Sequence, residues 1–209
     1  MPVEFRPSDV ESRKVYRTLV SGVVPRPIGW ISTIDADGND NIAPFSFFNV
    51  ACVDPPIIHF AHGTHADGTL KDTARNILET EEFVHNVVTG EVLERMHGTS
   101  ATYPSEVSEF DACEIERAPS ETVVPPRVAD AKVSFECTLD RALELGSHIL
   151  FLGEIQYIHL DDSVVTDEGE LDIFELDAVG RLAAGQYLEL KEFLELPSVK
   201  DEDFPKSED

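Results

Sequence analysis

The segment that decides the fold spans residues 25–61 and reads PRPIGWISTIDADGNDNIAPFSFFNVACVDPPIIHFA. Residues 28–34 are apolar or β-branched, as in a strand. Asp35-Ala36-Asp37-Gly38 then supplies turn residues before a second run begins near Asn41. This pattern predicts a β-hairpin.

The second half of the segment predicts further extended structure. After a break at Pro44, residues 45–51 are expected to continue the second strand of the hairpin. Pro55-Pro56 then forces extended backbone before a strand at 57–61. Strands therefore dominate the first third of the chain.

Outward from this segment, hydrophobic periodicity and turn residues predict the other elements. The helices are one over 10–20, with Ser8 and Glu11 at capping-box spacing, one capped by Asp72 and running to 78, and a short one over 91–96. A strand is expected over 83–88, and a long hairpin is formed by 133–145 and 149–160 about Gly146-Ser147. Residues 97–126 are expected to form a largely irregular excursion, and residues 192–209 an acidic, frayed tail.

Many strands joined by tight turns, with only short helices, favour an antiparallel barrel of mainly β structure over a parallel α/β sheet. We expect one domain over residues 1–209, because no linker divides the 209-residue chain. Neither GxGxxG nor GxxxxGK[ST] occurs, so a Rossmann or P-loop nucleotide site has no support.

The charge balance is unusual, with 41 acidic and 16 basic residues and a formal net charge of -25. Nucleic acid and anionic membranes need a cationic surface, so both are excluded as expected partners. Self-repulsion of this size destabilises a compact state in dilute buffer and is screened in concentrated salt. We therefore expect a halophilic source and loss of folding in low salt.

Other bulk features predict a cytoplasmic protein. No apolar run is long enough to span a bilayer, and the N-terminal residues lack the apolar stretch of a signal peptide. Cys52, Cys113 and Cys137 are odd in number and widely spaced, which is typical of reduced thiols.

Several motifs occur in a fixed order along the chain. They are PRPIGW, an S-T pair before a D-x-D-G turn, NIAPFSFFN and a D-P-P segment, followed by KDTARNI at 71–77, EFVHNVV at 82–88, PPRVADA at 125–131 and AVGRLAAGQY at 178–187. This set closely resembles the flavin reductase-like family of FMN-binding split β-barrels. The resemblance covers about residues 20–190 and implies an antiparallel, Greek-key type barrel with short peripheral helices. The acidic charge balance in addition leads us to expect a source among halophilic archaea.

The resemblance implies an FMN-binding oxidoreductase, in the first instance an NAD(P)H-dependent flavin reductase that acts as a homodimer, with no catalytic acid or base supplied by the chain. Its substrates would be a nicotinamide or a free flavin, and an oxygenase or electron-transfer protein is a possible partner. A flavoredoxin-like electron carrier reduced by a protein partner is the alternative. A pyridoxamine phosphate oxidase-like or haem-handling split barrel fits the NIAPFSFFN motif less well.

FMN needs an anion site for its phosphate, hydrogen bonds to its ring edge and an apolar wall. The expected phosphate and ribityl contacts are small polar residues and a helix start: Ser32, Thr33, Ser46, Asn49, Lys71, Asp72 and Thr73. A solvated Lys71 and an ordinary capping Asp72 are the alternative.

The expected ring contacts are Pro27, Ile28, Gly29, Trp30, Phe47 and Phe48. Gly29 permits close backbone approach, whereas Trp30 fits a core position equally well. Phe47 and Phe48 should point to opposite faces of a strand, so one of them is expected to wall the flavin while the other fills the barrel.

Arg181 and Tyr187 are the expected substrate-binding residues, facing an acidic substrate or a nicotinamide nucleotide phosphate. An intersubunit salt bridge of Arg181 is the alternative. No metal site is expected, because His59, His62 and His65 lie three residues apart and do not share a strand face. His65 and His97 remain possible donors to flavin carbonyls.

Overall fold

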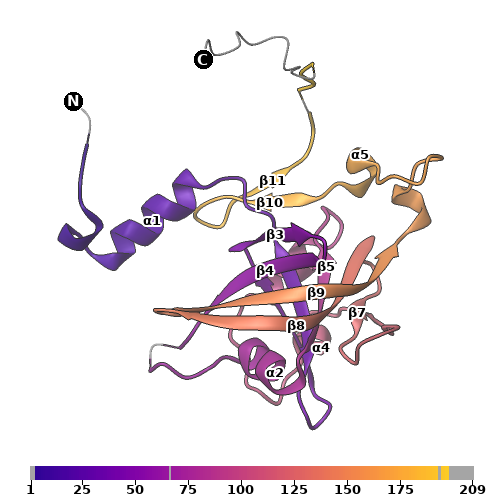
Figure 1. The fold of residues 1–209 in the computed structure, drawn as a ribbon, viewed down its shortest axis with the longest axis horizontal. Helices are drawn as coiled ribbons and strands as arrows, with labels where there is room; N and C mark the ends of the chain where they lie inside the picture. Colours follow the sequence, from indigo (N-terminus) through magenta and orange to yellow (C-terminus); the bar gives the residue numbers. More distant parts are fainter. Residues whose placement is uncertain (1–2, 66, 193, 198–209) are drawn as a thin grey trace, which may run out of the picture.

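A seven-stranded antiparallel sheet organises the molecule, in the order β2-β1-β5-β8-β9-β4-β3 (Figure 1). The computed structural model describes residues 3–65, 67–192 and 194–197. The strands of the sheet are β1 (Gly29–Ile34), β2 (Asp40–Phe45), β3 (Phe48–Val53), β4 (Pro56–Gly63), β5 (Glu82–Val87), β8 (Val133–Leu145) and β9 (His148–Leu160).

The remaining elements are short and lie around this sheet. Two small sheets pair β6 (Arg117–Ala118) with β7 (Arg127–Val128) and β10 (Val179–Arg181) with β11 (Tyr187–Glu189). The helices are α1 (Ser12–Gly22), α2 (Asp72–Thr80), α3 (Leu93–Gly98), α4 (Glu109–Ala112) and α5 (Ile173–Leu176), with 3-10 turns η1 (Pro7–Asp9) and η2 (Asp162–Val164). The expected mainly β, antiparallel architecture is confirmed.

The two edges of the sheet meet at Ser46-Phe47. Strands β2 and β3 stand at opposite ends of the strand order, yet only these two residues separate them in the chain. The sheet must therefore curl until its edges adjoin, and the Ala61 N–H of β4 donates to the Phe47 carbonyl at 2.8 Å, which extends the β3–β4 pairing into the junction. The result is a barrel that is open along this seam, a split barrel.

This closure corrects one prediction. Residues 45–51 do not continue β2; the chain leaves one edge of the sheet at Phe45 and starts a new strand, β3, on the other. Pro44 lies within β2, near its end. A proline is tolerated there because β2 is an edge strand, where the missing N–H is not needed. The hairpins β1–β2 and β8–β9 are confirmed, and their partner residues include Ile31 with Ala43.

Apolar side chains from β1 enter two separate cores. Ile31 packs inside the barrel with Phe60, Phe83 and Phe151, together with the buried face of α2. Its neighbour Trp30 points to the opposite side, where it packs with the second core under α3 and α4. Both faces of β1 are therefore covered, which explains its continuous apolar sequence.

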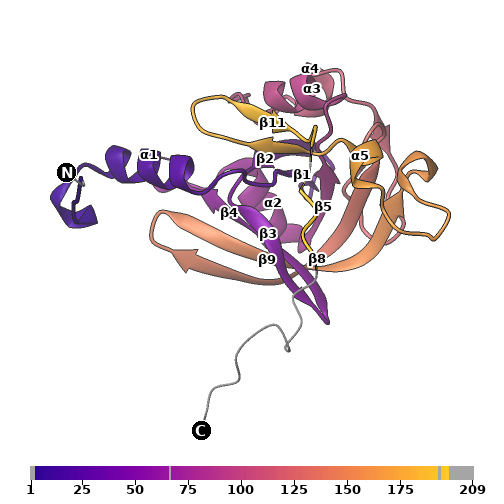
Figure 2. The same ribbon diagram turned by 90° about the horizontal axis from the view of Figure 1, so that it is seen from above.

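The first helix differs from its prediction. It begins at Ser12, its N-cap is Glu11 without a side-chain hydrogen bond, and Ser8 donates to Asp9 instead of closing a capping box. A 3-10 turn over Pro7–Asp9 stands where the cap at Ser8 was expected. Figures 1 and 2 show α1 extending away from the barrel, and Val20 is its one buried residue.

The excursion over 97–126 is mostly irregular, as predicted, but polar contacts hold it to the sheet. Glu136 on β8 is fully buried and accepts hydrogen bonds from the Glu121 and Thr122 N–H groups at 2.7 and 2.6 Å and from Nε2 of His159 at 2.5 Å. Burial opposes ionisation of Glu136, but these hydrogen bonds outweigh it and lower the pKa to about 2. A buried carboxylate therefore fixes the end of the excursion.

Candidate functional site

Two adjoining cavities lie along β2, where the sheet edge meets the excursion and the C-terminal β10–β11 hairpin. Their volumes are about 600 and 590 Å³. Pro44, Phe45 and Ser100 line both, so the two cavities form one trough with Phe45 at its middle. Each is in the size range of a small-molecule site.

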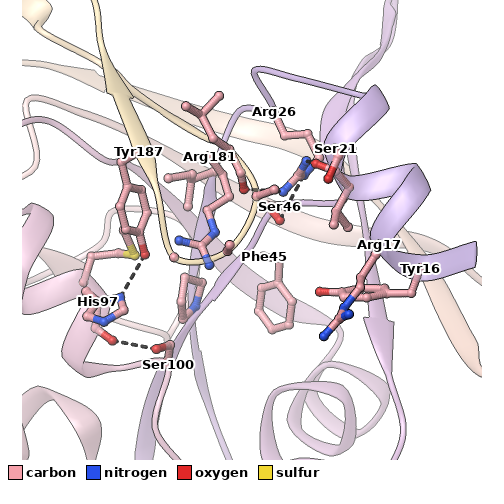
Figure 3. A pocket seen from close by; sticks show the side chains of 18 residues that line it. Tyr16, Arg17, Ser21, Arg26, Phe45, Ser46, His97, Ser100, Arg181 and Tyr187 are labelled. Carbon is pink, nitrogen blue, oxygen red and sulfur yellow. Dashed lines mark hydrogen bonds between the residues drawn. The ribbon is translucent and has the colours of Figure 1, made fainter. Parts of the chain in front are cut away.

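The first, which we call the arginine cavity, lies between α1, β2, α3 and β10–β11 (Figure 3). Among the residues that the structure describes, three arginines and no Asp or Glu line it, and its apolar walls include Ile28 and Met96. The lining residues are Tyr16, Arg17, Val20, Ser21, Arg26, Ile28, Pro44, Phe45, Ser46, Met96, His97, Ser100, Arg181, Leu182, Ala183, Ala184, Gly185 and Tyr187.

Arg26 is the structural arginine of this cavity. It is 7% exposed, and its guanidinium donates to the backbone carbonyls of Val20, Val23 and Leu182 at 2.6, 2.8 and 2.9 Å. It thereby ties the end of α1 to the loop between β10 and β11. Burial, and then the nearby charge of Arg181, lower the pKa of Arg26.

Arg181 lies beside Arg26 because the two residues form a two-way backbone bridge, at 3.0 and 2.7 Å. Its guanidinium carbon stands 4.5 Å from the centre of the Tyr187 ring. The Tyr187 hydroxyl is in turn hydrogen-bonded to Nδ1 of His97 at 2.9 Å. Nη1 of Arg181 is shielded from solvent and has no hydrogen-bond partner in the described part of the chain, so this cation faces the cavity uncompensated there.

The second, which we call the lysine cavity, opens at the start of α2 and is lined by Lys71, Asp72, Thr73, Arg75, His62 and Glu109 among others. Lys71 is the N-cap of α2 and forms no ion pair among the described residues, whereas Arg75 pairs with Asp72 at 2.6 Å. The first N–H groups of a helix have no intrahelical acceptor, so they and Lys71 together suit an anion.

A buried polar chain supports this end of the trough. Glu109, 7% exposed, accepts from Nδ2 of Asn41 at 2.8 Å, and Oδ1 of Asn41 accepts from the Thr73 hydroxyl at 2.7 Å. Thr33 donates to the same Asn41 oxygen at 3.3 Å. Burial raises the pKa of Glu109. Strand β2, helix α2 and the excursion are thus linked through one amide.

Comparison with known proteins decides the class of this site. A model of the flavin reductase like domain matches residues 21–172. The chain belongs to the flavin reductase-like family. It is 40% identical to a protein of Aquifex aeolicus over 89% of this chain and 95% of that one. The relatives found are mainly bacterial, which gives no support to the expected archaeal source.

Two solved structures share the fold closely. Nitrilotriacetate monooxygenase component B from Bacillus cereus is 28% identical with a TM-score of 0.90, covering 94% of this chain and 99% of that one. The 2-nitrobenzoate 2-nitroreductase NbaA from Pseudomonas fluorescens is 26% identical with a TM-score of 0.87, covering 98% and 100%. The trough of this flavin reductase-like chain is therefore its candidate flavin site.

The residues of the trough fit a flavin mononucleotide. Lys71 and the start of α2 offer an anion site at one end, and Phe45 and Ile28 supply apolar surface in the middle. The unpartnered buried donor of Arg181, at the other end, is left for a second ligand. The trough also brings together the expected residues Ile28, Ser46, Lys71, Asp72, Thr73, Arg181 and Tyr187.

Of the expected contacts that lie outside both cavities, three are fully buried on β1. Trp30 is fully buried and donates from Nε1 to the Thr99 hydroxyl at 3.0 Å, so it occupies the core position that the sequence left open. Ser32 and Thr33 are also fully buried, with Ser32 donating to the Pro126 carbonyl at 2.6 Å. On a strand covered on both faces, small polar side chains serve internal hydrogen bonds.

The structure supplies a packing reason for glycine at position 29. A Cβ at this position would lie 2.6 Å from Cδ2 of Phe48, so the glycine makes room for a phenylalanine ring. Phe48 in turn stacks on His85 with ring centres 4.5 Å apart, inside the barrel.

Pro27, Phe47, Phe48 and Asn49 line a third, more open groove of about 360 Å³ beside the trough. Phe47 stacks there on His148, at 5.8 Å between ring centres. Asn49 turns its side chain back to the Val50 N–H. These residues therefore lie together at the seam, in a groove that shares Arg26 and Ser46 with the arginine cavity.

Sequence reasoning missed several residues of the trough. Arg17, Arg26, Asn41, Phe45, Ser100 and Glu109 all line it, and His97 was named as a flavin neighbour without its Tyr187 contact. Arg26 belongs to the PRPIGW motif at 25–30, and this motif is the sequence feature that could have indicated its place in the site. Glu109 lies in the excursion over 97–126, where no hydrophobic periodicity predicts which way a side chain points.

Two absences concern the described residues alone. Among residues 3–65, 67–192 and 194–197, no helix is long and apolar enough to cross a membrane. In the same part of the chain no group of three His, Cys, Asp or Glu side chains is placed to hold a metal ion.

Proposed function

We propose that this chain is an FMN-dependent oxidoreductase that takes electrons from NADH or NADPH. The observation that carries the proposal is the trough along β2, with an uncompensated cation at each end and apolar walls between, in a chain of net charge -25. An unpartnered buried donor such as Nη1 of Arg181 destabilises the fold unless an anionic ligand binds there, and Lys71 is exposed and able to contact a second anionic group.

In this proposal Lys71 and the N–H groups at the start of α2 hold the FMN phosphate. Phe45, Pro44 and Ile28 cover the ring system, and Ser46 and Ser100 are within the same lining to bond its polar edge. The bound flavin supplies the redox chemistry by accepting a hydride and passing electrons on. The chain contributes binding, orientation and exclusion of water.

The fixed geometry of the trough supports the positioning role. Glu109 and Thr73 hold Asn41 from both sides, and Arg26 holds the end of α1 through three carbonyls. No titratable side chain is assigned to proton transfer. Rigid placement of two reactants supplies a large part of the rate enhancement of such a reaction.

Stopped-flow oxidation of NADH and NADPH with FMN tests this reading. We expect nucleotide oxidation that depends on added FMN and saturates with it. Absence of turnover with both nucleotides, in protein that binds FMN, would favour the second reading, a flavoredoxin-like carrier reduced by a protein partner. Nitrilotriacetate monooxygenase component B, by its name, is one component of an oxygenase, which supports an oxygenase as a further possible partner here.

We also propose a cytoplasmic homodimer. The exposed apolar residues Tyr16, Leu19 and Val23 on or just after α1 and Val50 and Val53 on β3 support an interface at the seam, because exposed apolar patches mark contact sites. The three cysteines are free, in keeping with a reducing compartment. Sedimentation with and without FMN measures the oligomeric state.

A further inference from the structure

The arginine cavity has a charge composition unlike the rest of the chain. Acidic residues make up 41 of the 209 residues, so an eighteen-residue lining drawn at random would contain several, and the lining formed by the described residues contains none. It contains Arg17, Arg26 and Arg181. We infer that this cavity binds the carboxylate of an organic, ring-bearing electron acceptor through Arg181; the inference rests on the proposed flavin site and names its substrate class.

Arg181 is the cation available to a ligand. Its side chain has no hydrogen-bond acceptor among the described residues, and Nη1 is shielded from solvent, which leaves a buried donor unsatisfied. An unsatisfied buried donor is costly, more so when charged, and a bidentate carboxylate would offset that cost. Arg26 cannot serve in this way, because its donors are used by the carbonyls of Val20, Val23 and Leu182.

The contacts of Arg181 also define its orientation. One face of the guanidinium lies over the Tyr187 ring at 4.5 Å, and the hydrogen bond between Tyr187 and His97 fixes that ring. Figure 3 shows the guanidinium pointing into the cavity between Tyr187 and Phe45. A planar anion bound at this fork would carry its body toward Phe45, at the middle of the trough.

The walls favour a carboxylate on an apolar ring over a phosphate. Beyond the guanidinium, the apolar side chains of the lining are those of Pro44, Phe45, Ile28 and Met96, beside the hydroxyl groups of Ser46 and Ser100. The helix N–H groups that would complete a phosphate site lie at the other end, at α2. Arg17 on α1 lines the same cavity and forms no ion pair among the described residues. It adds positive charge at the side opposite Tyr187 (Figure 3).

Calorimetric titration of the FMN-loaded and FMN-free protein with benzoate, benzamide and inorganic phosphate tests the inference. The variants are Arg181→Met, Arg181→Lys and Arg17→Met. Arg13→Met is the matched control, because Arg13 lies one helical turn before Arg17 and outside this cavity. FMN affinity is measured on every variant.

We expect wild type to bind benzoate more tightly than its neutral analogue benzamide. Arg181→Met should weaken benzoate about tenfold or more, as loss of a charge-assisted hydrogen bond implies, while leaving benzamide and FMN within about twofold. Arg181→Lys should restore part of the benzoate affinity, and Arg13→Met should leave it unchanged.

Equal affinity for benzoate and benzamide, absence of benzoate binding, or an Arg181→Met protein that binds benzoate as wild type does would overturn the inference. Loss of FMN affinity in Arg181→Met, with phosphate competing against FMN, would also overturn it by assigning Arg181 to the cofactor. Failure of the protein to bind FMN would instead contradict the proposed function, and Arg181-dependent benzoate binding to the FMN-free protein would still support the anion site.

Discussion

The Thr73 hydroxyl donates its one hydrogen to Oδ1 of Asn41, at 2.7 Å. Thr73 is 2% exposed, and the Asn41 amide is itself held by Glu109 at 2.8 Å. The threonine at the start of α2 therefore has no proton left for a phosphate. At this end of the trough, anion binding falls to Lys71 and the backbone of the helix.

Substitution at Lys71 and Thr73 should separate binding from stability. We expect Lys71→Met to weaken FMN about tenfold or more, because a charged donor to the phosphate is lost. Thr73→Val should lower the free energy of unfolding by about 1 kcal/mol, since a buried hydrogen bond is lost, with a smaller effect on FMN. Fluorescence titration and urea unfolding measure the two quantities.

Arg75→Met is the control for this pair, because Arg75 is already engaged by Asp72 at 2.6 Å. Its effect on FMN should be well below that of Lys71→Met. An equal loss of FMN affinity in Thr73→Val and Lys71→Met would show that the hydroxyl contributes to phosphate binding as much as the amine does, and would contradict the assignment.

Adding a methyl group to a glycine inside the barrel should lower the free energy of unfolding. A Cβ on Gly153 would lie 2.2 Å from Cζ of the fully buried Phe83. We expect Gly153→Ala to lower the free energy of unfolding by about 1–3 kcal/mol, through overpacking. Gly22→Ala is the control, since nothing lies within 4 Å of its Cβ position. Comparable losses in both variants, measured by urea unfolding, would refute the packing explanation.

Stability should fall in mild acid because of a buried histidine. Burial lowers the pKa of His85 from 6.5 to about 4, against the opposing effect of its hydrogen bond with the Ile28 carbonyl. A depressed histidine pKa means that the unfolded state binds the proton first, so stability present above pH 6.5 is lost as the pH falls toward 4. The shift corresponds to about 3 kcal/mol for this residue.

His85→Gln cannot take up that proton, so its unfolding free energy should vary less between pH 7 and pH 4 than that of wild type, whatever its stability at neutral pH. His62, whose pKa burial also lowers to about 4, remains in both proteins and contributes equally. Parallel pH profiles of wild type and His85→Gln would contradict this assignment.

Folding should depend on salt. With 41 acidic against 16 basic residues, like-charge repulsion is screened as the Debye length falls from about 10 Å at 0.1 M to about 3 Å at 1 M salt. We expect the melting temperature followed by circular dichroism to rise steeply with KCl. A neutral osmolyte at matched osmolality should not reproduce the full effect, and unchanged melting down to a few tens of millimolar salt would refute the expectation.

Local patterns predicted the strands well, because the β1–β2 and β8–β9 hairpins are set by neighbours in sequence. Sheet closure was not predictable in this way. The change of sheet edge at Ser46-Phe47 depends on β4 and β9, which lie later in the chain. A strand that continues and a strand that crosses to the other edge have the same local composition.

The site was predicted only in part, because its contacts join residues that lie far apart in the sequence. Lys71 and Arg181 stood out as scarce cations, and both line the trough. Ser32 and Thr33 have the right chemistry for a phosphate, but their strand is buried on both faces and their hydroxyls are used inside. The contact between Tyr187 and His97 joins residues 90 positions apart, a distance over which no sequence pattern operates.

The central claim, that the trough along β2 is an FMN site, is tested most directly by titrating the purified protein with FMN and recording its visible spectrum. We predict saturable binding with flavin absorption peaks near about 370 and 450 nm that shift on binding, and weaker binding by Lys71→Met. No binding of FMN by folded protein, or a haem spectrum in its place, would contradict the account.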